Sequence, residues 1–202
     1  MTSKTDALKT IRDEVWALTQ SPLYKERVEN GNYPVLGEGS HDARIMFIGE
    51  APGKNEAKEG RPFCGAAGKI LDELLEHIGV PRVEVYITNV VKDRPPNNRD
   101  PLTEEIELYA PFLDRQIEVI QPQVLAALGR HSMKYVLERY GSEIMLPTIS
   151  EAHGKDYAGK LSYGEVVIIP LYHPAVAVYD ASKKDELKKD FEVLKQYCSG
   201  SK

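Results

Sequence analysis

Three segments of the chain place residues that could bind or stabilise a ligand directly after short apolar runs. Gly49-Glu50-Ala51-Pro52-Gly53 follows the first run, Asn89 lies at the end of the second, and His173-Pro174 follows the third. Short, β-branched runs that stop at Gly or Pro are typical of buried strands. Because ligands of open α/β sheets bind at the carboxyl ends of the strands, these segments predict a single ligand site.

Each segment offers a different kind of contact. Gly49 and Gly53 let backbone N–H groups approach a ligand closely, and Glu50 adds a carboxylate. The amide of Asn89 has donors and an acceptor with which to read the edge of an amide-containing base. The imidazole of His173 can donate a hydrogen bond to a developing anion, and the proline after it restricts its backbone to an extended conformation.

Two further candidates lie between the first and second segments. Phe63 stands in the small-residue stretch 62–68, where an aromatic ring could stack on a flat ligand. Glu56 could orient a water molecule or exclude solvent. All the candidates have structural alternatives: Phe63 as a core plug, Glu56 as a solvated acid, Asn89 as a turn residue and His173 as a surface or capping residue.

The charge distribution is compatible with nucleic acid, although the 202-residue chain has a formal net charge of −5. That charge excludes a strongly basic coat, but a local group of basic side chains can supply phosphate contacts. The basic residues predicted to contact DNA, from the loops after the first two runs, are Lys54, Arg61, Lys92, Arg94 and Arg99. The alternative is ordinary solvated surface charge.

Other classes of function lack their motifs. Two cysteines far apart predict a reducing compartment without a disulfide framework, and no metal site is predicted because paired Cys or His ligands are missing. The sequence has no Walker loop, dinucleotide fingerprint or nucleophile elbow. No apolar run approaches the roughly 18 residues of a membrane helix, and the start of the chain lacks a signal-peptide core. We therefore expect a cytoplasmic protein that does not contact membranes.

The elements that must position these residues alternate between strand and helix patterns within one predicted domain, residues 1–202. Strands are expected at 44–48, 83–90, 123–128 and 166–170, with a short strand or hairpin within 150–162. Helices are expected at 7–19, 68–78, 103–120, 130–140 and 185–197, and loops at 21–40 and 56–67. This alternation predicts an α/β fold with a central, mostly parallel four-stranded sheet and helices on both faces.

Taken together, the motifs resemble those of the family 4 uracil-DNA glycosylases, over roughly residues 15–197. The matching segments are Gly49-Glu50-Ala51-Pro52-Gly53-x-x-Glu56, Gly60-Arg61-Pro62-Phe63-x-Gly65-x-Ala67-Gly68, Val85-Tyr86-Ile87-Thr88-Asn89-x-x-Lys92-x-Arg94-Pro95-Pro96-x-Asn98-Arg99-x-Pro101 and His173-Pro174-Ala175. The resemblance implies a three-layer α/β/α sandwich and excision of a base flipped out of DNA.

The resemblance also implies roles for the candidates. Phe63 would stack on the flipped uracil, Asn89 would read its edge, and His173 would steady negative charge on the departing base. The backbone of residues 49–53 would line the pocket, and Glu56 would guard or assist it. Whether Glu50 or Glu56 assists catalysis stays open at this point.

The chain departs from the family pattern at two places. The four positions of the cysteines that hold an iron–sulfur cluster are occupied here by Leu18, Ser21, Asp93 and Tyr109. None of these can replace a cluster thiolate, so we expect no iron–sulfur cluster, with local packing joining 21–30 to 93–109. The second place is the segment after His173-Pro174-Ala175, where the family often has a bulky Leu and a basic residue near the point at which a wedge enters the duplex. Here Val178 or Tyr179 would act as the wedge, or wedging would be weak and single-stranded DNA preferred. Ala51 is usual in family 4 and stands where family 1 enzymes have a water-activating Asp, so catalysis would depend on His173 and backbone donors.

These observations lead to one main hypothesis and two alternatives. The main one is a monomeric glycosylase of base excision repair that removes uracil from single- or double-stranded DNA. The first alternative is a glycosylase for another deaminated base, hypoxanthine or xanthine. The second is a non-catalytic or covalent binder of uracil-containing DNA.

Overall fold

The computed structural model describes residues 3–142 and 145–198, and a six-stranded sheet with the order β1-β3-β2-β4-β6-β5 runs through it. The strands are β1 (Glu38–Gly39), β2 (Ile45–Gly49), β3 (Tyr86–Asn89), β4 (Val124–Leu128), β5 (Tyr157–Leu161) and β6 (Gly164–Leu171). The four central strands are parallel, and β1 and β5 add antiparallel edges. The predicted fold class is confirmed, although the sheet has six strands because two short edges extend the expected four.

The helices include four that the sequence pattern did not predict. The α-helices are α1 (Lys4–Trp16), α2 (Pro22–Glu29), α3 (Lys54–Glu59), α4 (Ala66–His77), α5 (Thr103–Ile120), α6 (Arg130–Tyr140), α7 (Ile149–Ala152), α8 (Ala175–Tyr179), α9 (Lys184–Glu192) and α10 (Lys195–Cys198). The 3-10 turns are η1 (Arg82–Glu84), η2 (Pro96–Asn98) and η3 (Ala181–Lys183). The bounds predicted for α5 and α6 are confirmed, whereas the last predicted helix divides into α9 and α10.

Of the four unexpected helices, α7 begins the segment predicted as a strand or hairpin and α8 follows His173-Pro174. The other two, α2 and α3, lie in segments predicted to be loops. The Ser21 side chain accepts a hydrogen bond from the Leu23 N–H, and Pro22 stands in the first turn, which is a standard helix start. Helix α3 is only six residues long and ends at Gly60, whose φ is +68°. Neither helix is long enough to reveal itself by apolar periodicity.

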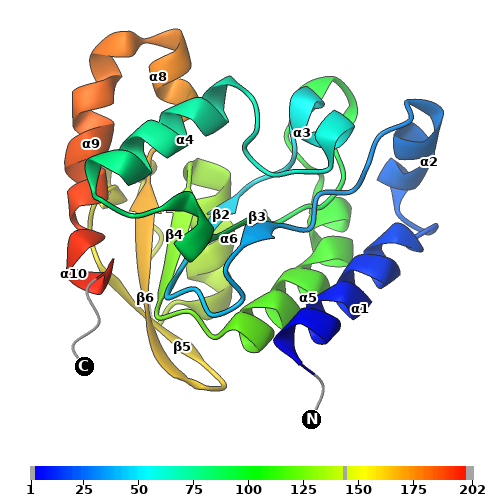
Figure 1. The fold of residues 1–202 in the computed structure, drawn as a ribbon, viewed down its shortest axis with the longest axis horizontal. Helices are drawn as coiled ribbons and strands as arrows, with labels where there is room; N and C mark the ends of the chain where they lie inside the picture. Colours follow the sequence, from blue (N-terminus) through cyan, green and yellow to red (C-terminus); the bar gives the residue numbers. More distant parts are fainter. Residues whose placement is uncertain (1–2, 143–144, 199–202) are drawn as a thin grey trace.

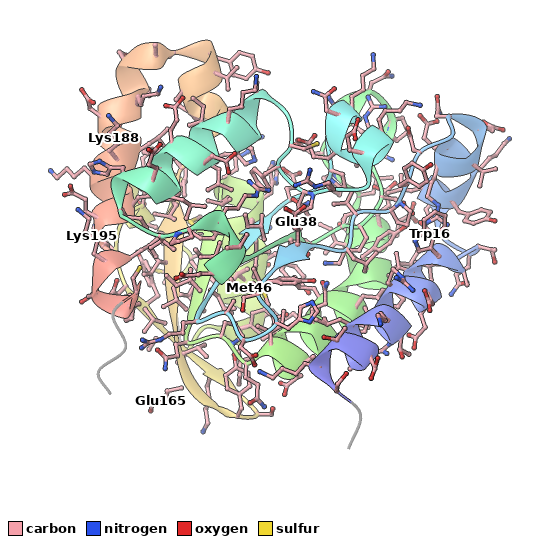
Figure 2. All side chains as sticks on the ribbon, in the orientation of Figure 1. Trp16, Glu38, Met46, Glu165, Lys188 and Lys195 are labelled. Carbon is pink, nitrogen blue, oxygen red and sulfur yellow. The ribbon has the colours of Figure 1, made fainter. Side chains whose placement is uncertain are left out.

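Helices cover both faces of the sheet, so each face has its own core. Along β2, Met46 and Ile48 pack in the core shared with α1, α5 and α6, whereas Ile45 and Phe47 pack in the core shared with α4 and α9. This alternation follows from the two-residue period of a strand. In Figure 1 the sheet lies between α4 and α9 on one side and α1 and α5 on the other. Figure 2 shows Met46 inside and Lys188 and Lys195 on the outer side of α9 and α10.

The sheet brings the three predicted segments to one edge. Gly49 of β2 is paired in register with Asn89 of β3, so the first two segments leave the sheet side by side. His173 follows β6, and β4 lies between β2 and β6. The Gly129 N–H, just after β4, donates to the carbonyl of Leu171 at 2.8 Å. None of the helices in the described part of the chain combines the length and apolar character that crossing a bilayer requires.

Candidate active site

A pocket of about 510 Å³ opens where β2, β3 and β6 end. The predicted site residues that line it are Glu50, Ala51, Gly53, Lys54, Glu56, Phe63, Asn89, Arg99, His173, Val178 and Tyr179. Gly49, Arg61, Lys92 and Arg94 do not line it. The main prediction from the sequence, that the three loops converge, is therefore confirmed.

Gly49 lets two side chains of the pocket pack closely on β2. A Cβ added at this position would stand 2.3 Å from Asn89 Oδ1 and 3.0 Å from the ring of Phe63. Both distances are too short for ordinary contact, so any side chain here would displace the amide or the aromatic ring. The glycine thus lets Asn89 and Phe63 take the positions in which they line the pocket.

Asn89 is a buried polar residue whose amide is left for a ligand. Its exposed fraction is only 2 %, and its side chain makes no hydrogen bond to the protein within residues 3–142 and 145–198. Its backbone is fixed, because its carbonyl accepts from Lys92 Nζ at 2.6 Å and β3 pairs with β2. A buried amide on a fixed backbone is suited to reading donors and acceptors on a ring edge.

His173 is partly buried in the pocket wall and neutral at pH 7. Burial lowers its pKa to about 4, although the nearby Glu56 carboxylate acts in the opposite direction. The Ala175 N–H donates to His173 Nδ1 at 3.1 Å, so the neutral ring carries its proton on Nε2. The ring stacks on Phe63 with 5.5 Å between centroids. This arrangement presents a neutral N–H donor.

Glu56 holds the loop that carries Phe63. Its Oε1 accepts the backbone N–H groups of Cys64 at 3.0 Å and Gly65 at 2.9 Å, directly before α4. Phe63 has a φ of +47°, which non-glycine residues seldom adopt, so an anchor immediately after it is needed. One carboxylate oxygen is therefore already engaged in shaping the pocket.

Glu50 differs because its carboxylate is less engaged. Its Oε1 is buried without a hydrogen-bond partner among the described residues, and burial raises its pKa. Its nearest titratable neighbours are Asp100 and His131, and one ligand atom from each of the three lies within 4.8 Å of the others. These atoms could hold a cation, but the Arg130 guanidinium, 3.5 Å from Asp100 Oδ2, already brings positive charge there.

The residues predicted to contact DNA differ in their exposure and in whether a carboxylate already pairs with them. Tyr179 is 90 % exposed and Val178 44 % exposed, and Lys54 is exposed beside them. Arg99 is bound by Glu105, with Nη2 to Oε1 at 2.6 Å, and Arg61 is bound by Glu38 at 2.7 Å. The two arginines would meet DNA with part of their charge already neutralised.

Arg94, in the loop after β3, is another predicted DNA contact whose side chain reaches the surface. Its Nε donates to Asn98 Oδ1 at 2.6 Å, and the side chain is half-buried. It stands away from the pocket lining, so a contact with DNA would lie beside the pocket rather than over it.

The prediction that Lys92 contacts DNA is wrong. The side chain is fully buried, and its Nζ donates to Thr88 Oγ1 at 2.9 Å, to the carbonyl of Asn89 at 2.6 Å and to Gln116 Oε1 at 2.5 Å. No carboxylate is among these partners. The residue supports β3 from behind, because its long side chain folds back under the strand instead of towards the basic surface.

The sequence reasoning also missed residues that complete the wall. Pro95, Asn98 and Asp100 line the pocket. Asn97 and Asn98 have φ values of +55° and +54°, which bend the loop after Pro96 back to the rim. The consecutive asparagines were a usable signal, since Asn tolerates the left-handed conformation better than most residues.

The amino-acid sequence is similar to those of known proteins. A family model described as "Uracil DNA glycosylase superfamily" matches residues 36–195. A "Type-4 uracil-DNA glycosylase" of Sulfurisphaera tokodaii is 45% identical over 192 residues, covering 95% of this chain and 84% of that protein. One from Archaeoglobus fulgidus is 41% identical, covering 96% of this chain and 94% of that protein. A "Type-5 uracil-DNA glycosylase" of Pyrobaculum aerophilum is 31% identical, covering 78% and 73%.

Proposed function

Since this chain belongs to the uracil DNA glycosylase superfamily, we propose that it is a uracil-DNA glycosylase that hydrolyses the N-glycosidic bond of uracil in DNA. The observation that carries the assignment is that the amide of Asn89, the ring of Phe63 and the imidazole of His173 line one pocket of about 510 Å³. Phe63 offers a face on which a flat base can stack, and Asn89 offers a donor and an acceptor for an amide edge.

Recognition of uracil follows from the hydrogen-bonding groups of its edge. Uracil presents a carbonyl beside a ring N–H, and the Asn89 side chain can donate to the first and accept from the second. Cytosine presents an amino group beside an unprotonated nitrogen, which reverses both roles. An amide that donates with Nδ2 to the carbonyl and accepts with Oδ1 from the ring N–H therefore discriminates between them, because the wrong base leaves buried groups unpaired.

Bond cleavage develops negative charge on the base and positive charge on the sugar. His173 Nε2–H donates to a carbonyl oxygen of the departing base, so the anion is stabilised without needing a charged imidazole. Water adds to the sugar carbon, one of its protons passes to solvent, and the base leaves with the bonding electron pair. Glu50, with an unpartnered oxygen, is the better candidate to orient that water, whereas Glu56 positions Phe63.

The assignment is tested by base release from uracil-containing oligonucleotides, detected by alkaline cleavage. Removing the amide in Asn89→Ala, or the donor in His173→Ala, should each slow single-turnover excision by about 10²–10³. Glu14→Gln is the control, because Glu14 lies on α1 and pairs with Arg115. Near-wild-type rates in both pocket variants would contradict the assignment.

The same assay separates the alternatives. Release of hypoxanthine or xanthine in preference to uracil would point to another deaminated base, and binding without release would point to a non-catalytic binder. An adduct that survives denaturation would indicate a covalent one. Single- and double-stranded substrates compared side by side give the strand preference. The monomeric state and cytoplasmic location stay predictions, and sedimentation velocity tests the first.

A further inference from the structure

The four positions that the family resemblance assigns to cluster cysteines do not fit an iron–sulfur cluster in this chain. They hold Leu18, Ser21, Asp93 and Tyr109, and none of these side chains supplies a thiolate. The two cysteines lie elsewhere: Cys64 directly precedes the N-cap of α4, and Cys198 is in α10. No side chain with a suitable ligand atom stands in for the missing ligands.

Three of these four positions instead form a hydrogen-bonded cluster that also includes Arg27. The Arg27 guanidinium contacts Asp93 with Nη1 3.0 Å from Oδ2. The Tyr109 hydroxyl donates to Asp93 Oδ2 at 2.6 Å and contacts Ser21 Oγ at 2.9 Å. The exposed fractions of Arg27, Asp93 and Tyr109 are 4 %, 1 % and 0 %. We call Ser21, Arg27, Asp93 and Tyr109 the buried quartet.

Arg27 extends the quartet to the end of α1. Its Nη1 donates to the carbonyl of Val15 at 3.2 Å, and its Nη2 donates to the carbonyl of Trp16 at 2.6 Å. These are carbonyls of the last turn of α1, which lack partners within the helix. The guanidinium also lies over the ring of Tyr24, 4.8 Å from the centroid. Figure 2 shows Trp16 at this end of the molecule, beside α2.

The quartet therefore joins three parts of the chain that are distant in sequence: α2 with its N-cap, the loop after β3, and α5. Ser21 precedes α2, Arg27 lies in α2, Asp93 follows β3 and Tyr109 lies in α5. Such a connection is the mechanical task that a cluster with ligands at these positions would perform. Here a neutralising ion pair and a hydroxyl perform it with every partner provided by the protein.

The connection bears on the pocket because Asp93 begins the loop that forms one wall. The next residues are Arg94 and Pro95, and Pro95, Asn98 and Arg99 line the pocket. Two consecutive prolines, 95 and 96, make the segment stiff, so a shift at Asp93 would be carried to the wall.

We infer that the buried quartet replaces an iron–sulfur cluster in this chain and that Asp93 is a positioning residue for the wall at 94–99. The role in substrate binding rests on the proposed function. The replacement of the cluster does not, because it concerns folding and metal content alone.

The first test is metal analysis of the full chain purified without oxygen. We expect iron far below one cluster per chain and no visible absorption band from a cluster. Stoichiometric iron with such a band would overturn the inference. This measurement is independent of whether the protein excises uracil.

The second test is a double-variant comparison of Arg27→Met, Asp93→Asn and the two combined. Each single variant removes one member of the ion pair and should lower the melting temperature, and the combined variant should lose less than the sum of the two. Glu14→Gln, which breaks an exposed ion pair between α1 and α5, is the matched control and should change little. Strict additivity of the two changes would overturn the inference.

The third test asks whether Asp93 positions the pocket wall or only stabilises the fold. With Asp93→Asn kept well below its melting temperature, KM for uracil-containing DNA should rise about tenfold with kcat nearly unchanged, because the wall moves while Asn89 and His173 stay. Unchanged KM with a lowered melting temperature would overturn the positioning role. If wild type excises no uracil at all, the proposed function fails, and the metal and melting measurements still decide the cluster replacement.

Discussion

The pocket and the polar groups behind it differ in whether their hydrogen-bonding atoms have partners within the protein. In the pocket, the amide of Asn89, the Nε2 of His173 and one oxygen of Glu50 have no protein partner among the described residues. Behind it, Lys92 Nζ has three acceptors and the Asp93 carboxylate has both Arg27 and Tyr109. The change occurs within five residues of the chain.

This contrast separates binding capacity from rigidity. Unpaired buried groups cost folding free energy, typically about 1–3 kcal/mol each, and recover it only when a ligand fills them. Fully paired networks hold the backbone so that the unpaired groups stay aimed. Substitutions in the pocket should therefore alter excision more than stability, and substitutions behind it should do the reverse.

The largest expected effect on this contrast comes from Gly49→Ala. The added Cβ would stand 2.3 Å from Asn89 Oδ1 and so displace the amide proposed to read the base. Single-turnover excision should fall by at least about 100-fold, the scale of a 1 Å misplacement of reacting groups. The free energy of unfolding, measured in urea, should change much less.

Gly31→Ala is the matched glycine control. Gly31 has a φ of +57° and nothing within 4 Å of an added Cβ, so only backbone strain is introduced. Stability should fall by about 1 kcal/mol, while excision is kept. A loss of excision as large as that of Gly49→Ala would show that glycine strain, not displacement of Asn89, explains both results.

The second largest expected effect is the change with pH that His173 causes in the free energy of unfolding. Folded His173 takes up a proton only near pH 4, whereas in the unfolded chain it does so near pH 6.5. Between these values the unfolded chain binds the extra proton, so the free energy of unfolding falls as the pH falls from 6.5 to 4, by up to about 3 kcal/mol.

Urea unfolding of wild type and His173→Asn between pH 4 and 8 measures this contribution as a difference. The variant should lose less stability over the acid range, and the two curves should run parallel above pH 6.5. Parallel curves over the whole range would mean that the pocket does not hold the imidazole neutral.

The sequence predicted the pocket better than the networks that support it. Gly49, Asn89 and His173 were predictable because each follows a strand whose apolar pattern is clear, and parallel strands deliver their ends to one edge. Lys92 and Arg27 were not, since nothing local distinguishes a buried basic residue from a surface one. Their burial depends on Gln116 and Asp93, which the fold brings from distant parts of the chain. Helix α2 was missed although Ser21-Pro22 signals a helix start.

The smallest effect, Lys92→Met, tests whether the two networks behind the pocket are alike. Burial without a carboxylate partner lowers the Lys92 pKa well below 10.5, so the folded chain loses this proton at a lower pH than the unfolded chain does. Methionine removes the cost of burying an ionisable amine but leaves three oxygens without their donor. The free energy of unfolding at pH 7 should therefore change by less than about 2 kcal/mol.

The dependence on pH distinguishes Lys92 from the ion-paired Asp93. Between the lowered pKa of the folded chain and 10.5, the unfolded chain holds a proton on Lys92 that the folded chain lacks, so wild-type stability should rise with pH in that interval relative to Lys92→Met. Urea unfolding of both proteins between pH 6.5 and 9.5 gives that difference directly. A difference that does not change with pH would mean that three oxygen acceptors suffice to keep the buried ammonium charged. Lys92 would then stand as a second buried charge beside the ion pair of Asp93, balanced by dipoles instead of a carboxylate, and the site would be supported by two charged networks.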